Sequence, residues 1–237
     1  MKNVFKFKQF NVDQTNCAMK INTDGVLLGA LTEANDPQSI LDIGTGTGVI
    51  ALMLAQRFTS AKIDAVEIDE DAAETARENF NNSPFIYRII AYTTGFESFF
   101  EQYPHKKFDL IVSNPPFFLN SLESPGIKKN LARHTDEGFY KKLITAVAEH
   151  LTETGTCQLI LPVPTANLVK GLLPECQLHL QKQISICSFP DDAPHREILI
   201  IGNTQTGIIK KTFVIYDHPK VYSVAYQNTL KEFFTIF

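Results

Sequence analysis

The amino-acid sequence predicts an α/β fold: a mostly parallel sheet with an antiparallel pair of strands at one edge and a short N-terminal addition. Three observations carry this prediction. From residue 39 onward short apolar runs alternate with helix-like stretches, a glycine-rich turn follows the first run, and residues 178–188 and 196–202 are strand-like without a helix between them. Alternating strands and helices are typical of parallel sheets, whereas two consecutive strands favour an antiparallel pair.

Composition places the chain among globular proteins. Of its 237 residues 44% are hydrophobic and 20% are charged, values that exclude a disordered or fibrous chain. The longest apolar run, residues 49–55, is far shorter than the roughly 20 residues of a membrane-spanning helix, and the first residues lack a secretory signal. The four cysteines lie far apart without a C-x-x-C pair. We therefore expect a cytoplasmic protein without a bound metal.

The N-terminal addition comprises residues 1–37. Residues 4–12 alternate apolar and polar side chains, which predicts a short strand or hairpin arm. Residues 25–34 are apolar enough to form a helix, which Thr23 or Asp24 can cap and which ends near Asp36 and Pro37.

The alternating core begins at residue 39. We predict strands over residues 39–43, 62–67, 85–92, 108–113 and 156–161, and helices over residues 47–57, 70–81, 96–102, 137–150 and 167–173. Residues 117–136 are predicted to form a loop, because the prolines after Asn114 end the fourth strand. A strand over residues 212–216 and a helix from residue 224 follow. We expect one domain, 1–237, with a cofactor-binding core at 38–203 and a C-terminal strand and helix in 204–237.

The first candidate site is the turn after the first core strand, where Asp42 precedes three alternating glycines, Gly44, Gly46 and Gly48. Glycine permits positive φ and lets a ligand approach the backbone closely. The spacing G-x-G-x-G differs from the dinucleotide fingerprint G-x-G-x-x-G, and a carboxylate before the first glycine suits a cationic amine better than a phosphate. S-adenosylmethionine is such a ligand, and we expect it to contact Asp42, Thr45 and the glycines. A merely tight turn is the alternative.

Glu67 ends the second predicted strand, where open α/β sheets place ligand contacts. A carboxylate there can accept hydrogen bonds from both hydroxyls of a ribose. The apolar neighbours Val66 and Ile68 argue against the alternative that Glu67 is a surface residue of an acidic patch. We expect Glu67 and Ile68 to contact the cofactor.

The third candidate site is the segment Asn114, Pro115, Pro116 and Phe117 after the fourth predicted strand. Its prolines fix a rigid, extended backbone. An exocyclic amine is a weak nucleophile that must be oriented, and the Asn114 side-chain oxygen and the Pro115 carbonyl can accept both of its hydrogens. Phe117 offers a flat surface on which a base can stack. We expect these four residues to be catalytic; a strand that merely ends in prolines is the alternative.

Charge is unevenly distributed. Residues 61–80 hold seven acids against two cations, although the whole chain has a net charge of only −4. Lys128, Lys129, Arg133, Lys141 and Lys142 crowd a later segment. We expect Lys128, Lys129 and Arg133 to bind RNA, opposite the acidic segment, and a solvated lysine face is the alternative.

The three motifs together resemble the amino-methylating class I S-adenosylmethionine-dependent methyltransferases, whose fold is Rossmann-like. Further segments resemble the bacterial tRNA(Val) adenine-37 N6-methyltransferase family over nearly the whole chain: residues 7–10, 17–20, 23–30, 132–134, 194–196 and 222–223. The resemblance implies cofactor contacts at Asp42, Gly44, Gly46 and Glu67, an amine-binding loop at 114–117, and the adenine beside the anticodon of valine tRNA as substrate.

One departure from the resembled family concerns the cofactor adenine. That family commonly has an acidic residue after the third strand, where this chain has Thr94 and Gly95, so we expect the Thr94 hydroxyl or a backbone carbonyl to contact the adenine amine. The Asn-Pro-Pro signature also occurs in enzymes that methylate guanine N2 in ribosomal RNA or glutamine N5 in release factors, and both stay open. A non-catalytic cofactor- and RNA-binding module is a further alternative, against which Asn114 argues.

Overall fold

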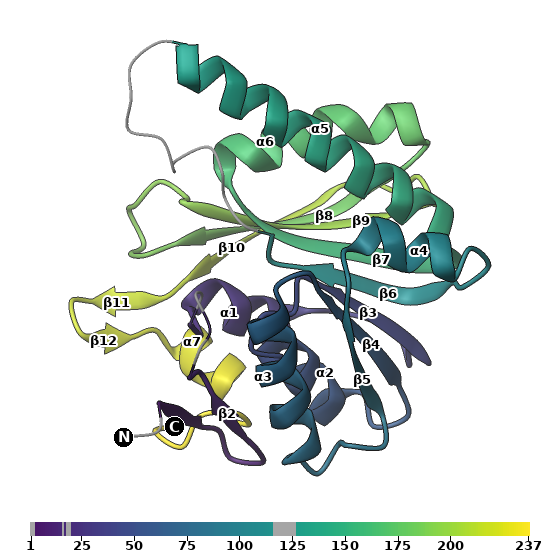
Figure 1. The fold of residues 1–237 in the computed structure, drawn as a ribbon. Helices are drawn as coiled ribbons and strands as arrows, with labels where there is room; N and C mark the ends of the chain where they lie inside the picture. Colours follow the sequence, from purple (N-terminus) through teal and green to yellow (C-terminus); the bar gives the residue numbers. More distant parts are fainter. Residues whose placement is uncertain (1–2, 16, 18–19, 116–126) are drawn as a thin grey trace.

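The computed structural model describes residues 3–15, 17, 20–115 and 127–237, and for residues 127–136 it describes the backbone alone. A central sheet in the order β10-β8-β9-β7-β6-β3-β4-β5 lies between two layers of helices (Figure 1). Within this sheet β9 alone runs against its neighbours. The strands are β3 (Ser39–Ile43), β4 (Lys62–Glu67), β5 (Ile89–Thr93), β6 (Phe108–Ser113), β7 (Leu151–Pro162), β8 (His179–Cys187), β9 (Arg196–Gly202) and β10 (Ile209–Val214).

Helices cover both faces of the sheet (Figure 1). One face carries α1 (Thr23–Leu31), α2 (Val49–Arg57), α3 (Glu70–Asn81) and α7 (Val224–Leu230); the other carries α4 (Phe96–Gln102), α5 (Ile127–His150), α6 (Val163–Leu172) and the 3-10 turn η2 (Leu173–Cys176). Each face has its own apolar core. Ile40 and Leu110 belong to the first, and their sequence neighbours Leu41 and Ile111 to the second. This alternation buries the sheet on both sides.

Two small hairpins lie outside the main sheet. They are β1 (Val4–Lys6) with β2 (Asn11–Asp13), and β11 (Tyr216–His218) with β12 (Val221–Tyr222). The first hairpin packs against the end of the chain: Phe7 forms a bridge with Phe234, and the Lys8 amide donates to the Phe233 carbonyl at 2.8 Å. The two chain ends therefore lie side by side (Figure 1).

The structure confirms the predicted class of fold, and six predicted elements match residue for residue: β3, β4, α3, α4, β6 and β9. The first helix is shifted. It begins at Thr23 and ends at Leu31, and its cap is Asn22, whose side-chain oxygen accepts from the Gly25 amide at 2.9 Å. The prediction of Thr23 or Asp24 as cap is therefore wrong.

The predicted loop over 117–136 is wrong from residue 127, because α5 begins at Ile127. Residues 127–136 contain neither proline nor glycine, so nothing local stops the helix there. Residues 116–126 lie outside the described residues. Other boundaries move by a few residues: α2 begins at Val49, β5 at Ile89, β7 at Leu151, α6 at Val163 and β10 at Ile209.

The antiparallel pair does not form the edge of the sheet as predicted. β9 pairs antiparallel with both β7 and β8, and β10 then adds to β8 in parallel. The strand predicted at 212–216 thus becomes the edge, because it covers backbone groups of β8 that would otherwise stay unpaired. Lysines 210 and 211 lie exposed on this new edge.

Candidate active site

The three sequence motifs meet at the carboxyl ends of neighbouring strands. β3 lies between β4 and β6 and pairs in parallel with both. The glycine loop therefore lies in the middle, with Glu67 at the end of β4 on one side and Asn114 after β6 on the other. The strand order reverses at β3, because β4 and β5 follow it on one side and β6 and β7 lie on the other, and open α/β sheets bind ligands at such a switch point.

The loop after β3 has a backbone that glycine adopts most readily, since Gly44, Gly46 and Gly48 have φ of 72°, 56° and 81°. A Cβ on Gly44 or Gly46 would meet no atom within 4 Å, whereas a Cβ on Gly48 would lie 2.4 Å from the Phe80 ring. The first two glycines thus leave open space beside the loop, and the third allows the loop to pack against α3.

Glu67 joins the glycine loop to the end of β4. Its Oε2 accepts from the Gly46 amide at 2.9 Å, and its Oε1 accepts from the Asp69 amide at 3.0 Å. Each carboxylate oxygen keeps a lone pair for another donor. Ile68 follows with 77% of its surface exposed, an apolar group available to pack on a flat ring.

Asp42 is fully buried beneath the loop. Its Oδ2 accepts from the Thr45 hydroxyl at 2.6 Å, but Oδ1 has no donor among the described residues. Burial raises the pKa of Asp42 to about 7; the Thr45 hydroxyl and the Ala51 amide oppose this shift, and the Glu67 charge adds to it. A buried acceptor without a donor is costly, so this oxygen fits a ligand that brings a positive charge or an N–H group.

Asn114 follows β6, whose end is fixed to β3 by the Ser113 hydroxyl donating to the Ile43 carbonyl at 2.7 Å. Its Oδ1 is shielded from water and lacks a donor within the described part of the chain. Its Nδ2 lies 3.7 Å from where a Cβ on Gly25 would stand, so the first turn of α1 forms one wall of the site. Pro115 is buried, while Pro116 and Phe117 lie outside the described residues and their roles stay predictions.

The region after β5 contains a residue that the sequence analysis missed. The Thr94 amide donates to the Glu67 carbonyl at 2.8 Å, and the Thr94 hydroxyl lies 3.3 Å from the Gly95 carbonyl. Oε2 of Glu97, in the first turn of α4, lies 3.6 Å from where a Cβ on Gly95 would stand. Glu97 thus brings a carboxylate next to Gly95, and the other oxygen of this carboxylate lies 3.7 Å from Lys142 Nζ. An acid in the first turn of a predicted helix was the signal that could have identified it.

The predicted RNA-binding residues Lys128, Lys129 and Arg133 lie in α5, not in a loop, and their side chains are outside the description. Lys141 and Lys142 of the same helix face acids: Lys141 Nζ lies 2.9 Å from Glu175 and Lys142 Nζ 3.7 Å from Glu97. RNA binding by the first three stays a prediction, while the latter two are partly neutralised within the protein.

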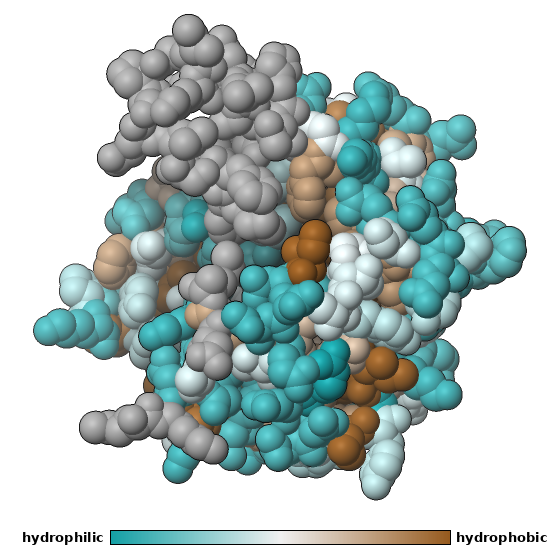
Figure 2. Space-filling view, in the orientation of Figure 1, coloured by the Kyte–Doolittle hydropathy of each residue, from teal (hydrophilic) through white to brown (hydrophobic). Residues whose placement is uncertain are grey.

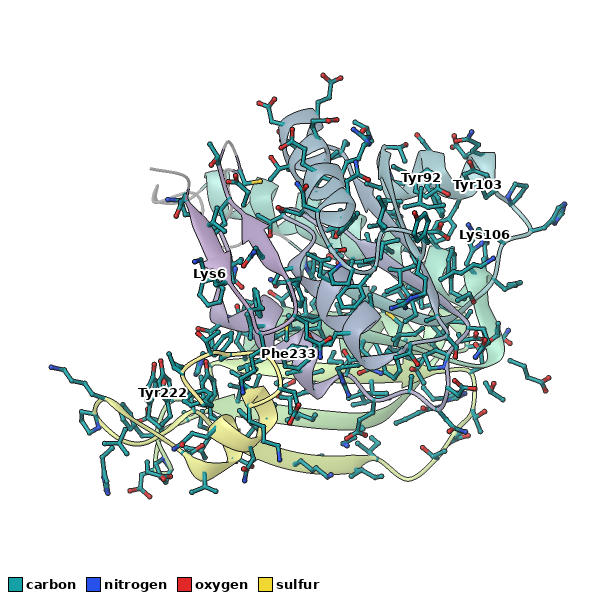
Figure 3. All side chains as sticks on the ribbon, turned by 90° about the horizontal axis from the view of Figure 1, so that it is seen from below. Lys6, Tyr92, Tyr103, Lys106, Tyr222 and Phe233 are labelled. Atoms are coloured by element: carbon teal, nitrogen blue, oxygen red, sulfur yellow. The ribbon has the colours of Figure 1, made fainter. Side chains whose placement is uncertain are left out.

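The acidic segment 61–80 is also partly neutralised. Buried Asp64 pairs with Lys106 at 2.5 Å and accepts from the Tyr92 hydroxyl at 3.1 Å (Figure 3). Glu74 pairs with Arg77, and Asp69 caps α3. The surface over α3 is nevertheless largely hydrophilic (Figure 2). Across the described ranges there is no cluster of three or more potential metal ligands, and no helix long and apolar enough to cross a membrane.

The parallel sheet, the glycine loop after β3 and the acidic and Asn-Pro strand ends beside it define a class I methyltransferase. Solved structures share this fold. A predicted O-methyltransferase from Agrobacterium tumefaciens is similar over 89% of this chain and 96% of its own, with a TM-score of 0.66 and 15% identity. A ribosomal protein L11 methylase from Lactobacillus delbrueckii subsp. bulgaricus is similar over 76% and 78%, with a TM-score of 0.55 and 20% identity.

Sequence comparison identifies the family. The family model described as "Methyltransferase small domain" matches residues 20–181. A protein of Pedobacter heparinus named tRNA1(Val) (adenine(37)-N6)-methyltransferase is 45% identical over the full length of both chains. A protein of the same name from Bacteroides thetaiotaomicron is 42% identical over 97% of this chain and 96% of its own. The chain belongs to this family of methyltransferases.

Proposed function

We propose that the protein transfers a methyl group from S-adenosylmethionine to the N6 amine of an adenine in tRNA, the adenine 3′ to the anticodon of valine tRNA. The names of its relatives suggest this substrate. The observation that carries the proposal is the buried Asn114 Oδ1, an acceptor just after β6 that has no donor among the described residues. On this proposal residues 1–237 act as one domain, in the cytoplasm where tRNA is modified.

The residues present fit the cofactor. Open space beside the glycine loop admits it, and the unpaired oxygen of Asp42 suits its amino group. Glu67 retains lone pairs for the ribose hydroxyls, while Ile68, Thr94 and Glu97 surround the position proposed for the adenine. When bound, S-adenosylmethionine supplies an electrophilic methyl group.

Asn114 orients the target amine. Its Oδ1 and the Pro115 carbonyl accept the two amine hydrogens, which turns the nitrogen lone pair toward the methyl group and away from the ring. A strong base is not required, because the nitrogen becomes acidic once it is alkylated and loses its proton readily. The N6 amine of adenine, the N2 amine of guanine and the N5 amide of glutamine all need two hydrogen-bond acceptors of this kind. The substrate therefore has to be identified from the methylated product.

Product analysis tests the proposed function. Valine tRNA transcript, ribosomal RNA and a release factor are each incubated with enzyme and cofactor carrying a labelled methyl group, and the digests are separated. We expect N6-methyladenosine from the tRNA, and none from a transcript with guanosine at the target position. Methylated guanosine from ribosomal RNA, methylated glutamine, or no label would each contradict the proposal.

Cofactor affinity should depend on pH through Asp42. Asp42 has a pKa of about 7 in the protein without ligand, and a cationic ligand binds its ionised form, so affinity rises as the pH is raised from 5.5 to 7.5. Calorimetric titration across this range measures the effect. The variant Asp42→Asn should bind weakly and without this dependence. A cofactor affinity of the unaltered protein that does not change with pH would show that Asp42 does not contact the amine.

RNA affinity should depend on the basic stretch of α5. Removing three phosphate contacts with Lys128→Ala, Lys129→Ala and Arg133→Ala should flatten the plot of log affinity against log salt by roughly one unit per contact. A salt series of tRNA binding measures the slope. Lys141→Ala, on the same helix but paired with Glu175, is the control and should leave the slope unchanged. Equal slopes for the triple variant and the unaltered protein would contradict RNA binding by these three residues. Lysines 210 and 211 would then be the next residues to replace.

A further inference from the structure

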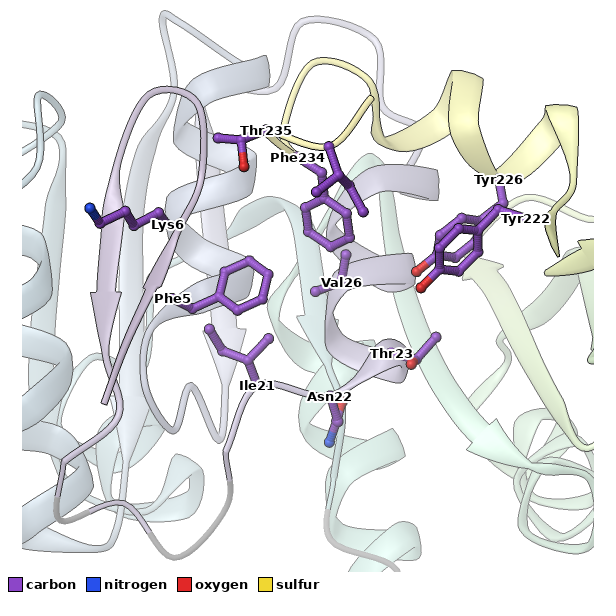
Figure 4. A pocket seen from close by; sticks show the side chains of 11 residues that line it. Phe5, Lys6, Ile21, Asn22, Thr23, Val26, Tyr222, Tyr226, Phe234 and Thr235 are labelled. Atoms are coloured by element: carbon purple, nitrogen blue, oxygen red, sulfur yellow. The ribbon is translucent and has the colours of Figure 1, made fainter. Parts of the chain in front are cut away.

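A cavity of about 370 Å³ lies beside the first turn of α1, and Asp42, Glu67 and Asn114 are not among the residues that line it (Figure 4). Its walls come from three separate parts of the chain: the N-terminal hairpin, residues 21–26, and the segment from β12 to the end. Aromatic rings form much of the lining, namely Phe5, Tyr222, Tyr226 and Phe234. Its volume is within the range of small-molecule sites.

The aromatic walls are held rigidly. Tyr216, Tyr222 and Tyr226 form a continuous stack, with ring centroids 5.0 and 4.7 Å apart and planes inclined by 21° and 9°. Phe5 and Phe234 pack against each other at 5.5 Å. Tyr222 is thereby covered on both faces, so the tyrosines present ring edges and hydroxyls to the cavity, and the rings on which a flat ligand can stack are the half-buried Phe5 and Phe234.

The polar groups of the cavity favour an anionic chain that carries flat bases. None of the lining residues is acidic, and Lys6 places a cation on the rim. The hydroxyls of Tyr222 and Tyr226 lie on the side facing Thr23 (Figure 4). Hydroxyl groups can donate to or accept from the edge of any base.

Asn22 connects this cavity to the active site. It lines the cavity, and its Oδ1 lies 3.5 Å from where a Cβ on Gly25 would stand, while Asn114 Nδ2 lies 3.7 Å from that same point. The two side chains therefore flank one turn of α1, and a ligand in the cavity is a close neighbour of whatever Asn114 holds.

We propose that this cavity receives an unpaired base of the RNA substrate, one or two nucleotides from the adenine that is methylated. This inference rests on the proposed function. Bases of a single-stranded loop splay out and stack on aromatic side chains. Holding this base fixes the RNA strand next to the target adenine. The adenine amine therefore meets Asn114 already oriented.

Fluorescence of a labelled RNA tests this inference without requiring turnover. Anticodon-arm hairpins carry the fluorescent base 2-aminopurine at each of the two positions on either side of the adenine, and stacking on an aromatic ring lowers its emission. Phe5→Leu removes a ring on which the base would stack, and Thr235→Trp at the exposed rim fills the cavity. Ile90→Trp, exposed on β5 at the far edge of the sheet, is the control for added bulk.

We expect quenching at one of these positions with the unaltered protein. Phe5→Leu and Thr235→Trp should abolish it and weaken hairpin binding about tenfold or more, as loss of one stacked base does. Tyr222→Phe keeps the ring and should keep the quenching. No quenching at any position, or equal affinities for all variants, would overturn the inference. Methyl transfer to the unlabelled hairpin is measured separately, so its failure would contradict the proposed function and not the base-binding cavity.

Discussion

Replacing Asn114 by alanine should lower methyl transfer about 100-fold or more and leave cofactor affinity nearly unchanged. The reason is that Asn114 Oδ1, unpaired in the described structure, is the acceptor proposed to orient the amine. A positioned electrostatic contact of this kind contributes about 10² to 10³ in rate. Single-turnover kinetics on valine tRNA, with calorimetry of the cofactor, separates the two effects.

Two further variants sharpen this experiment. Asn114→Asp keeps a side-chain acceptor at the same place and should retain more activity than Asn114→Ala. Asn203→Ala removes a surface amide that donates to the Thr152 carbonyl, and it should behave as the unaltered protein. Near-normal turnover of Asn114→Ala would show that the mechanism proposed for Asn114 is wrong.

Replacing Glu67 by alanine should weaken cofactor binding by about 2–4 kcal/mol, or roughly 30- to 1,000-fold, because two charge-assisted hydrogen bonds to the ribose are lost. Some of this loss arises in the protein itself, since the Gly46 and Asp69 amides lose their acceptor and the glycine loop is released from β4. Calorimetric titration measures the affinity.

The control for Glu67 is Glu74→Ala, an exposed acid of α3 that pairs with Arg77. It removes the same charge from the same acidic segment and should change cofactor affinity little. The thermal unfolding temperature of Glu67→Ala measures how much the loss of the two amide contacts destabilises the protein without cofactor. An unchanged cofactor affinity of Glu67→Ala would show that Glu67 does not bind the ribose.

The central part of the fold was predictable because its elements are short and sharply bounded. β3 ends at a glycine loop, and α3 begins directly after its cap Asp69, whose carboxylate accepts from the Ala72 amide. The position of β10 was not predictable, since its pairing with β8 is a long-range choice that local propensity does not encode. The same holds for the start of β7, where Leu151 pairs with Phe108 across an irregularity in the register.

The candidate site was predictable where its residues sit at strand ends, since topology alone brings Asp42, Glu67 and Asn114 together. Contributions from other elements were not. Asn22 and Gly25 come from the N-terminal addition, and Glu97, which lies beside Gly95, comes from a helix. These residues approach the site through packing of side chains in three dimensions, which spacing along the chain does not reveal.

The contact between the two chain ends has a consequence for synthesis. Phe5 and Phe7 pack on Phe234, and Phe7 is buried there. Translation proceeds at about 5–20 residues per second, so the hairpin waits on the order of 10–45 s before its partner leaves the ribosome. During this time its aromatic side chains face water or a chaperone. A segment that is made long before its partner is thus among the last to reach its native environment.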